Sequence, residues 1–130
     1  MNRLDYFIAR LEANMSPMEY VRSVKENPDQ YILLDVRVGP PDIKKDKIKG
    51  AVEIPLDRLE ERLSELPKDK EIIAYCWDTW CTLAAKAAII LLENGYGAKE
   101  MHGGIAAWKT LGLSVSPVDG GKDSLQSCEF

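Results

Sequence analysis

Residues 72–92 read IIAYCWDTWCTLAAKAAIILL: an apolar run ending at Cys76, a short loop, and an alanine-rich segment after Thr82. The first run is typical of a buried strand and the second of a helix. This order puts a thiol at the tip of a strand, beneath a loop that leads into a helix N-terminus. Unpaired backbone N–H groups and the positive end of a helix dipole favour thiolate over thiol there. Cys76 is therefore a candidate nucleophile, or else a buried cysteine that serves as a small apolar residue.

Strand and helix patterns alternate along the rest of the chain. Further strands are predicted over residues 31–36, 51–54 and 99–101, and further helices over residues 17–26 and 105–111. Asp57 is expected to cap another helix, which carries Leu59, Leu63 and Leu66. This alternation predicts an α/β fold, with a central, mainly parallel five-stranded sheet flanked by helices on both faces. Ligands of such sheets bind at the carboxyl ends of the strands, where Cys76 lies.

The two ends of the chain have their own patterns. Leu4, Phe7, Ile8 and Leu11 recur at helical spacing, which predicts an extra amphipathic N-terminal helix within residues 1–15. This helix could pack on its own domain or exchange with a second copy, giving a homodimer. Residues 16–115 form the α/β domain. Residues 116–130 are rich in Gly, Ser, Asp and Lys and are expected to be a mobile tail.

Composition excludes several classes of partner. The chain has 130 residues, 45% of them hydrophobic and 29% charged, as in ordinary globular domains. The net charge of -4 gives no electrostatic basis for binding nucleic acid or an anionic membrane. The N-terminus lacks the apolar run of a signal peptide, so a cytoplasmic location is expected. Three cysteines are a poor disulfide framework, so any bridge between Cys76 and Cys81 is expected to be transient.

Four segments resemble the rhodanese-like domain family, in the family's order over about residues 17–113. They are LLDVR at 33–37, IKGA with IPL at 48–56, the cysteine after Tyr75, and GGIAAW at 103–108 with Gly112. The resemblance implies that Cys76 takes sulfane sulfur as a persulfide from a small donor or a persulfidated protein. The persulfide then passes to an acceptor thiol or a similar nucleophile. The resemblance implies neither a metal nor an organic cofactor.

The loop departs from the family pattern. Active members commonly carry an arginine five residues after the cysteine, where this chain has Cys81. No Arg or Lys lies between Cys76 and Leu83, and Asp78 adds a negative charge. A bidentate arginine helps to hold an oxyanion, so its absence is expected to penalise thiosulfate. A neutral or protein-bound donor is less affected. Lys47 stands where the family often has histidine.

Other residues near the predicted site have two interpretations each. Cys81 could resolve a persulfide or disulfide on Cys76, or simply fill space. Trp77 and Trp80 could form an apolar rim or anchor the loop. Asp35 and Arg37 could support the active-site loop or form a surface ion pair. The loop expected to contact the substrate comprises Trp77, Asp78, Thr79, Trp80, Cys81 and Thr82.

Three functions remain open from the sequence. The first is a sulfurtransferase or sulfur carrier that uses Cys76. The second is a thiol redox protein that uses the pair Cys76 and Cys81. The third is a binding module that keeps the fold without catalysis, which the missing loop arginine favours and the retained cysteine disfavours. The lysine-rich run at residues 44–47 is interpreted as a solvated loop.

Overall fold

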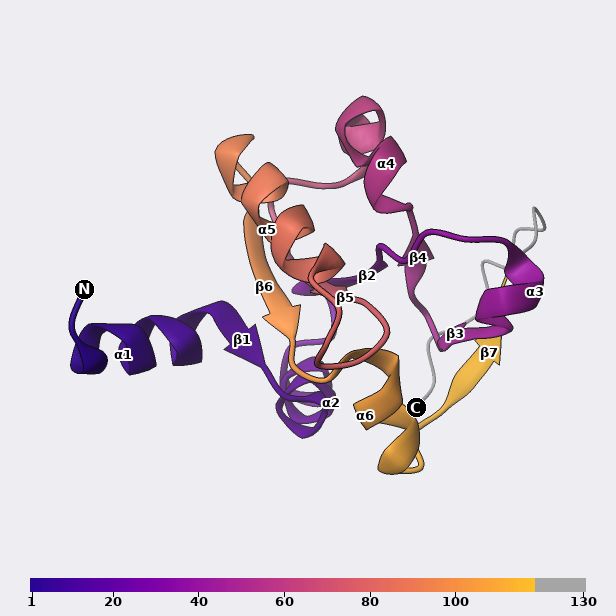
Figure 1. The fold of residues 1–130 in the computed structure, drawn as a ribbon, viewed down its shortest axis with the longest axis horizontal. Helices are drawn as coiled ribbons and strands as arrows, with labels where there is room; N and C mark the ends of the chain where they lie inside the picture. Colours follow the sequence, from indigo (N-terminus) through magenta and orange to yellow (C-terminus); the bar gives the residue numbers. More distant parts are fainter. Residues whose placement is uncertain (119–130) are drawn as a thin grey trace.

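A computed structural model describes residues 1–118, whose centre is a five-stranded parallel sheet (Figure 1). All neighbouring strands in it are parallel, in the order β1-β6-β5-β2-β4. The strands are β1 Asn14–Met15, β2 Tyr31–Asp35, β4 Val52–Glu53, β5 Glu71–Tyr75 and β6 Gly97–Met101. The predicted fold class is confirmed. The edge strand β1 falls within residues 1–15, where the sequence indicated a helix alone.

Helices cover both faces of this sheet. They are α1 Arg3–Ala13, α2 Pro17–Glu26, α3 Pro41–Lys44, α4 Leu56–Leu59, the 3-10 helix η1 Glu60–Glu65, α5 Leu83–Glu93 and α6 Gly104–Thr110. Alternate strand residues face opposite sides: Ile72 lies in the core beneath α4, η1 and α5, whereas Ile73 lies in the core beneath α2 and α6. Within residues 1–118 no helix is long and apolar enough to cross a bilayer.

Helix boundaries follow local signals where those signals are strong. Helix α2 begins with the capping box of Ser16 and Glu19 and spans the predicted residues. The predicted cap at Asp57 is wrong, because α4 already begins at Leu56 and no side chain caps it. The Leu56 N–H instead donates to Val36 O at 3.1 Å, so this first N–H of α4 is paired without a capping side chain. The segment then tightens into η1 instead of continuing as an α-helix.

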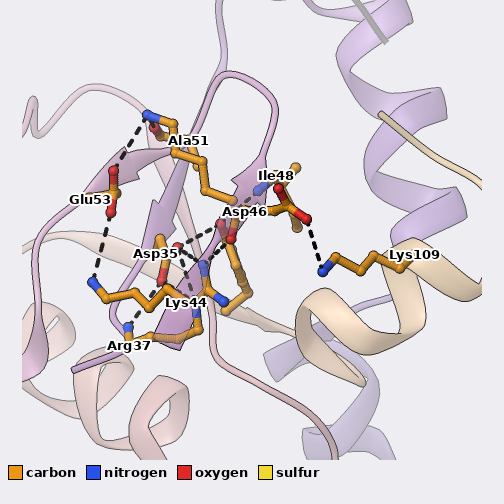
Figure 2. Close-up of polar contacts among 10 residues, drawn as sticks. Asp35, Arg37, Lys44, Asp46, Ile48, Ala51, Glu53 and Lys109 are labelled. Atoms are coloured by element: carbon orange, nitrogen blue, oxygen red, sulfur yellow. Dashed lines mark hydrogen bonds and ion pairs between the residues drawn. The ribbon is translucent and has the colours of Figure 1, made fainter. Parts of the chain in front are cut away.

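The lysine-rich run is not a solvated loop. It joins the end of α3 to strand β3 Asp46–Ile48, and both Lys44 and Lys47 are buried. Lys44 Nζ lies 3.7 Å from Glu53 Oε1 (Figure 2), and Lys47 Nζ lies 3.8 Å from Glu53 Oε2. Lys47 Nζ also donates to Ala51 O at 3.0 Å. The carboxylate and the carbonyl compensate the burial of these cations.

The C-terminal segment begins with a strand that the sequence did not indicate. Strand β7 Val115–Pro117 pairs with β3 in a separate antiparallel sheet, with Lys47 opposite Ser116. The first residues of the predicted mobile tail are therefore ordered by backbone pairing. The rest of that predicted tail, residues 119–130, lies outside the described residues.

Candidate functional site

Cys76 directly follows β5, which lies between β2 and β6 in the sheet. Its carbonyl oxygen accepts the Ile105 N–H at 3.0 Å, and the Trp77 carbonyl accepts the Ala106 N–H at 3.0 Å. The first turn of α6 therefore binds the backbone of the loop rather than the sulfur. Among residues 1–118 no hydrogen bond reaches Cys76 Sγ. The cradle of N–H groups predicted around the sulfur is thus absent from the structure in this state.

Gly104 lets α6 approach the loop closely. Its φ of +61° lies in the left-handed region. A Cβ at this position would lie 2.5 Å from Cys76 O and 2.9 Å from the carbonyl carbons of Cys76 and Trp77. Only glycine fits such a contact. The second glycine of the GG motif therefore positions the cysteine, a role that the sequence pattern alone did not indicate.

Cys76 and Cys81 form a disulfide, with their Cα atoms 6.3 Å apart. This separation lies within the usual disulfide range. The bond folds the loop back onto the end of β5, and Cys76 is only 3% exposed. The expectation of a reachable thiolate is therefore not met in this oxidised state. Cys81 is more than a space-filling residue, because it is covalently joined to Cys76.

The remaining loop residues form a tight turn with one exposed aromatic ring. The Asp78 carbonyl accepts the Cys81 N–H at 3.1 Å, and Asp78 Oδ1 accepts the Thr79 N–H at 2.6 Å. Trp80 is 71% exposed, whereas Trp77 is half-buried and packs against both cores. Thr82 precedes α5 without capping it through its side chain. The two tryptophans thus differ: Trp77 anchors the loop, and Trp80 is available at its surface.

Asp35 and Arg37 form a buried ion pair beside the loop, not a surface pair. Arg37 Nη2 lies 2.7 Å from Asp35 Oδ2 and donates to Asp46 O at 2.6 Å (Figure 2). The Arg37 guanidinium also lies 4.5 Å from the ring centre of Trp77, in cation–π range. Burial lowers the pKa of Arg37, but the hydrogen bonds and charge of Asp35 outweigh it, so the net shift is upward. Because it is buried, paired with Asp35 and stacked on Trp77, Arg37 supports the loop from beneath rather than replacing the missing loop arginine.

Tyr75 completes this network from the end of β5. Its hydroxyl donates to Asp35 Oδ2 at 2.9 Å and accepts the Ile48 N–H at 2.9 Å. Burial raises the pKa of Tyr75 well above 10.0, and the negative charge of Asp35 adds to the shift. The three side chains of Asp35, Arg37 and Tyr75 therefore connect β2, β5 and β3 beneath the loop.

The pKa of Tyr75 predicts a stability loss at alkaline pH. The phenol ionises near pH 10 in the unfolded chain but stays protonated in the folded chain, so stability falls as the pH rises above about 10. The contribution is at most about 1.4 kcal/mol per pH unit. Tyr75→Phe is expected to remove this part of the slope in urea titrations at several pH values. Tyr6→Phe, at an exposed tyrosine, is the control; an unchanged slope in Tyr75→Phe contradicts the prediction.

A cleft of about 640 Å³ lies away from the cysteines. Its lining includes Tyr31, Glu71 and Gly97, the first residues of three parallel strands. Cys76 follows the last residue of β5, so it lies at the carboxyl ends of the strands, whereas the cleft lies at their amino ends. The position of the cysteine at the carboxyl edge is the better guide to the chemistry, because the cleft contacts neither cysteine.

Comparisons with known proteins agree with this geometry. The chain is 31% identical over 93 residues to a sulfurtransferase of Allochromatium vinosum, covering 71% of this chain and 84% of that protein. It is 37% identical over 92 residues to an HTH-type transcriptional regulator of Mycobacterium tuberculosis, but it spans only 39% of the regulator's length. A crystal structure of a full-length Lactobacillus plantarum protein superposes with a TM-score of 0.84 at 30% identity. That match covers 89% of this chain and 97% of the other.

A family-level match covers most of the domain. Residues 17–111 match the rhodanese-like domain family, which is nearly the same segment that the sequence motifs indicated. The match includes β2, β4, β5 and β6 of the sheet, the loop after Cys76 and the GG motif. The chain belongs to the rhodanese-like domain family.

Proposed function

We propose that the chain is a sulfurtransferase or sulfur carrier that holds sulfane sulfur as a persulfide on Cys76. The observation that supports this most is the position of Cys76 after the central strand of a rhodanese-like domain. The likeness to the Allochromatium vinosum sulfurtransferase also supports it. The family alone does not specify the donor or the acceptor, so these are argued from the loop.

The proposed reaction has two displacement steps. The Cys76 thiolate attacks the outer sulfur of a donor R–S–S⁻, a sulfur–sulfur bond forms at Cys76, and the donor leaves as the thiolate RS⁻. An acceptor thiolate then attacks the outer sulfur of the persulfide. Cys76 leaves again as a thiolate, and the acceptor carries the sulfur as its own persulfide. Electrons balance in each step without an external oxidant.

The charges around the loop favour donors other than thiosulfate. Residues 77–82 contain no cationic side chain, and Asp78 contributes a negative charge. Arg37 already binds Asp35 and the Asp46 carbonyl. A dianionic donor therefore finds no free guanidinium here to compensate its charge. Polysulfides and persulfidated proteins are the donors that this loop fits better.

Uptake of sulfur requires the reduced protein, because a disulfide-bonded sulfur is not a nucleophile. Reduction frees Cys81, and the loop must then move aside, since Cys76 is 3% exposed in the oxidised state. The test is to reduce the protein, remove the reductant, add polysulfide or thiosulfate, and locate added sulfur by peptide mass spectrometry. We expect added sulfur on Cys76 with polysulfide and at least about tenfold less with thiosulfate. The absence of sulfur on Cys76 with both donors contradicts the proposal.

The disulfide favours a second candidate function, in which Cys81 resolves the persulfide. The Cys81 thiolate attacks Sγ of a persulfidated Cys76, the bond between the two cysteines forms, and hydrosulfide leaves. A dithiol reductant then restores both thiols and is itself oxidised to a disulfide. The same pair could cycle between dithiol and disulfide as a thiol redox site. This function rests on the 6.3 Å Cα separation of the two cysteines.

The substitution Cys81→Ser separates these two functions. We expect the variant to load sulfur on Cys76 but to release hydrosulfide at least about tenfold more slowly when no external thiol is present. We also expect it to lose the two-hydrogen mass decrease that mild oxidation causes in the wild-type chain. Cys128→Ser, which removes the third cysteine, is the matched control. Unchanged release of hydrosulfide in Cys81→Ser excludes the resolving role.

A further inference from the structure

Helix α1 stands apart from the rest of the domain (Figure 1). None of its eleven residues is buried. Leu4, Phe7, Ile8 and Leu11, here called the α1 stripe, remain 48% to 77% exposed. The structure therefore does not bury the α1 stripe against its own domain, and pairing with a second copy, the other arrangement that the sequence allowed, stays a prediction.

The α1 stripe is unfavourable in an isolated chain. A lone helix shorter than about 12 residues is marginal in water, because most helical stability in proteins comes from packing an apolar face. The capping box of Asn2 and Asp5 stabilises the start of α1 but covers none of its apolar side chains. A contiguous exposed apolar face with a defined helical spacing is typical of an interaction site.

The charges of α1 indicate what covers the stripe. At 100° per residue, Arg3 and Arg10 lie along one side of the stripe, whereas Asp5 and Glu12 lie along the other. No ion pair within residues 1–118 involves any of these four side chains. The four charges sum to zero, whereas helices that lie on membranes are usually rich in Lys and Arg. The α1 stripe, with a basic side and an acidic side, is thus complementary to a second α1 stripe.

We infer that α1 pairs with α1 of a second copy of this chain, in parallel, around a two-fold axis along the helices. In this arrangement the basic side of each helix faces the acidic side of its partner, and the two stripes meet at the centre. An antiparallel pair would instead set basic side against basic side. The charge pattern therefore specifies the orientation as well as the partner.

The expected interface is small. Eleven residues span about 16 Å, so the helix pair alone belongs to the weak class of interfaces. The parallel orientation also brings both Asn14–Met15 strands, and hence both domains, to the same end of the pair. A dissociation constant in the micromolar range is expected, which makes dimerisation dependent on protein concentration.

Sedimentation velocity of the full chain tests this inference, over about 1 to 300 µM. We expect the wild-type chain to become dimeric and Arg3→Glu/Arg10→Glu to stay monomeric. Asp5→Lys/Glu12→Lys should also stay monomeric, and an equimolar mixture of the two variants should form heterodimers. In the second variant Asn2 Oδ1 can still accept the residue 5 N–H, so the helix start is retained.

Leu92→Glu is the matched control, because Leu92 is an exposed apolar residue on α5 that the inference leaves outside the interface. It should dimerise like the wild-type chain. A wild-type chain that stays monomeric at every concentration overturns the inference, as does loss of dimer in Leu92→Glu. A monomeric chain that instead binds anionic lipid vesicles would assign α1 to a membrane surface.

Introduced cysteines test the orientation. In a Cys128→Ser background, Leu4→Cys should form an intermolecular disulfide under mild oxidation, because residue 4 faces residue 4 in a parallel pair. When Leu4→Cys and Leu11→Cys are mixed, disulfides between position 4 of one copy and position 11 of the other should form no more often than by random collision. Preferential crosslinking between positions 4 and 11 overturns the parallel arrangement.

Discussion

Cys76→Ser is expected to abolish sulfur uptake at residue 76, because no persulfide can form there. A serine hydroxyl is almost fully protonated at neutral pH and cannot carry sulfane sulfur. The substitution keeps the side-chain shape at a site that is 3% exposed, so the fold should be retained. The measurement is peptide mass spectrometry after incubation with polysulfide, combined with the free energy of unfolding of both proteins.

The matched comparison for this prediction is Cys81→Ser, which removes the other cysteine of the disulfide. This variant should still accept sulfur on Cys76, whereas Cys76→Ser should accept none. Sulfur found on Cys81 in Cys76→Ser would instead make Cys81 the primary acceptor. Undiminished biological activity of Cys76→Ser would support the non-catalytic binding module that the sequence left open.

Gly104→Ala is expected to have the largest effect on stability, lowering the free energy of unfolding by about 2 to 4 kcal/mol. Part of this cost is the left-handed backbone at φ +61°, which alanine adopts unfavourably. The rest arises because the new Cβ would lie 2.5 Å from Cys76 O. Either α6 or the end of β5 must shift, so sulfur uptake by Cys76 should fall as well. Chemical denaturation and the uptake assay measure the two effects.

Gly112→Ala provides the control for backbone conformation. Gly112 has a φ of +73°, but a Cβ there would meet no atom within 4 Å. It should therefore cost only about 1 kcal/mol and leave sulfur uptake unchanged. Equal costs for the two substitutions would show that the close approach of α6 to Cys76 contributes nothing to stability.

The sequence predicted the parts of the fold that local patterns determine. The apolar run at residues 72–75 and the Ser16–Glu19 capping box each depend on residues a few positions apart. The same holds for the GG motif, whose presence was recognised from the sequence. Because strands and helices alternate, these local assignments were enough to specify a parallel sheet and the carboxyl edge that carries Cys76.

Contacts between distant polar residues could not be predicted in this way. Lys44 and Lys47 appeared solvated because their partner, Glu53, lies on another strand and carries no periodic signal. The pairing of β3 with β7 joins segments about seventy residues apart. The spacing of Cys76 and Cys81 likewise does not reveal how the loop between them folds. The helix-dipole argument considered the helix after Thr82 and could not predict that α6, from a distant part of the chain, binds the carbonyls of Cys76 and Trp77.

The hydrogen bonds from α6 divide the cysteine loop into two mechanical parts. The backbone of Cys76 and Trp77 is tethered to Ile105 and Ala106, whereas the Asp78–Cys81 turn is held mainly by its own bonds and the sulfur bridge. Reducing the disulfide would release the Asp78–Cys81 turn but leave the backbone of Cys76 and Trp77 in place. The sulfur of Cys76 would thus stay in place, while Cys81 moves away from it on reduction and returns on oxidation.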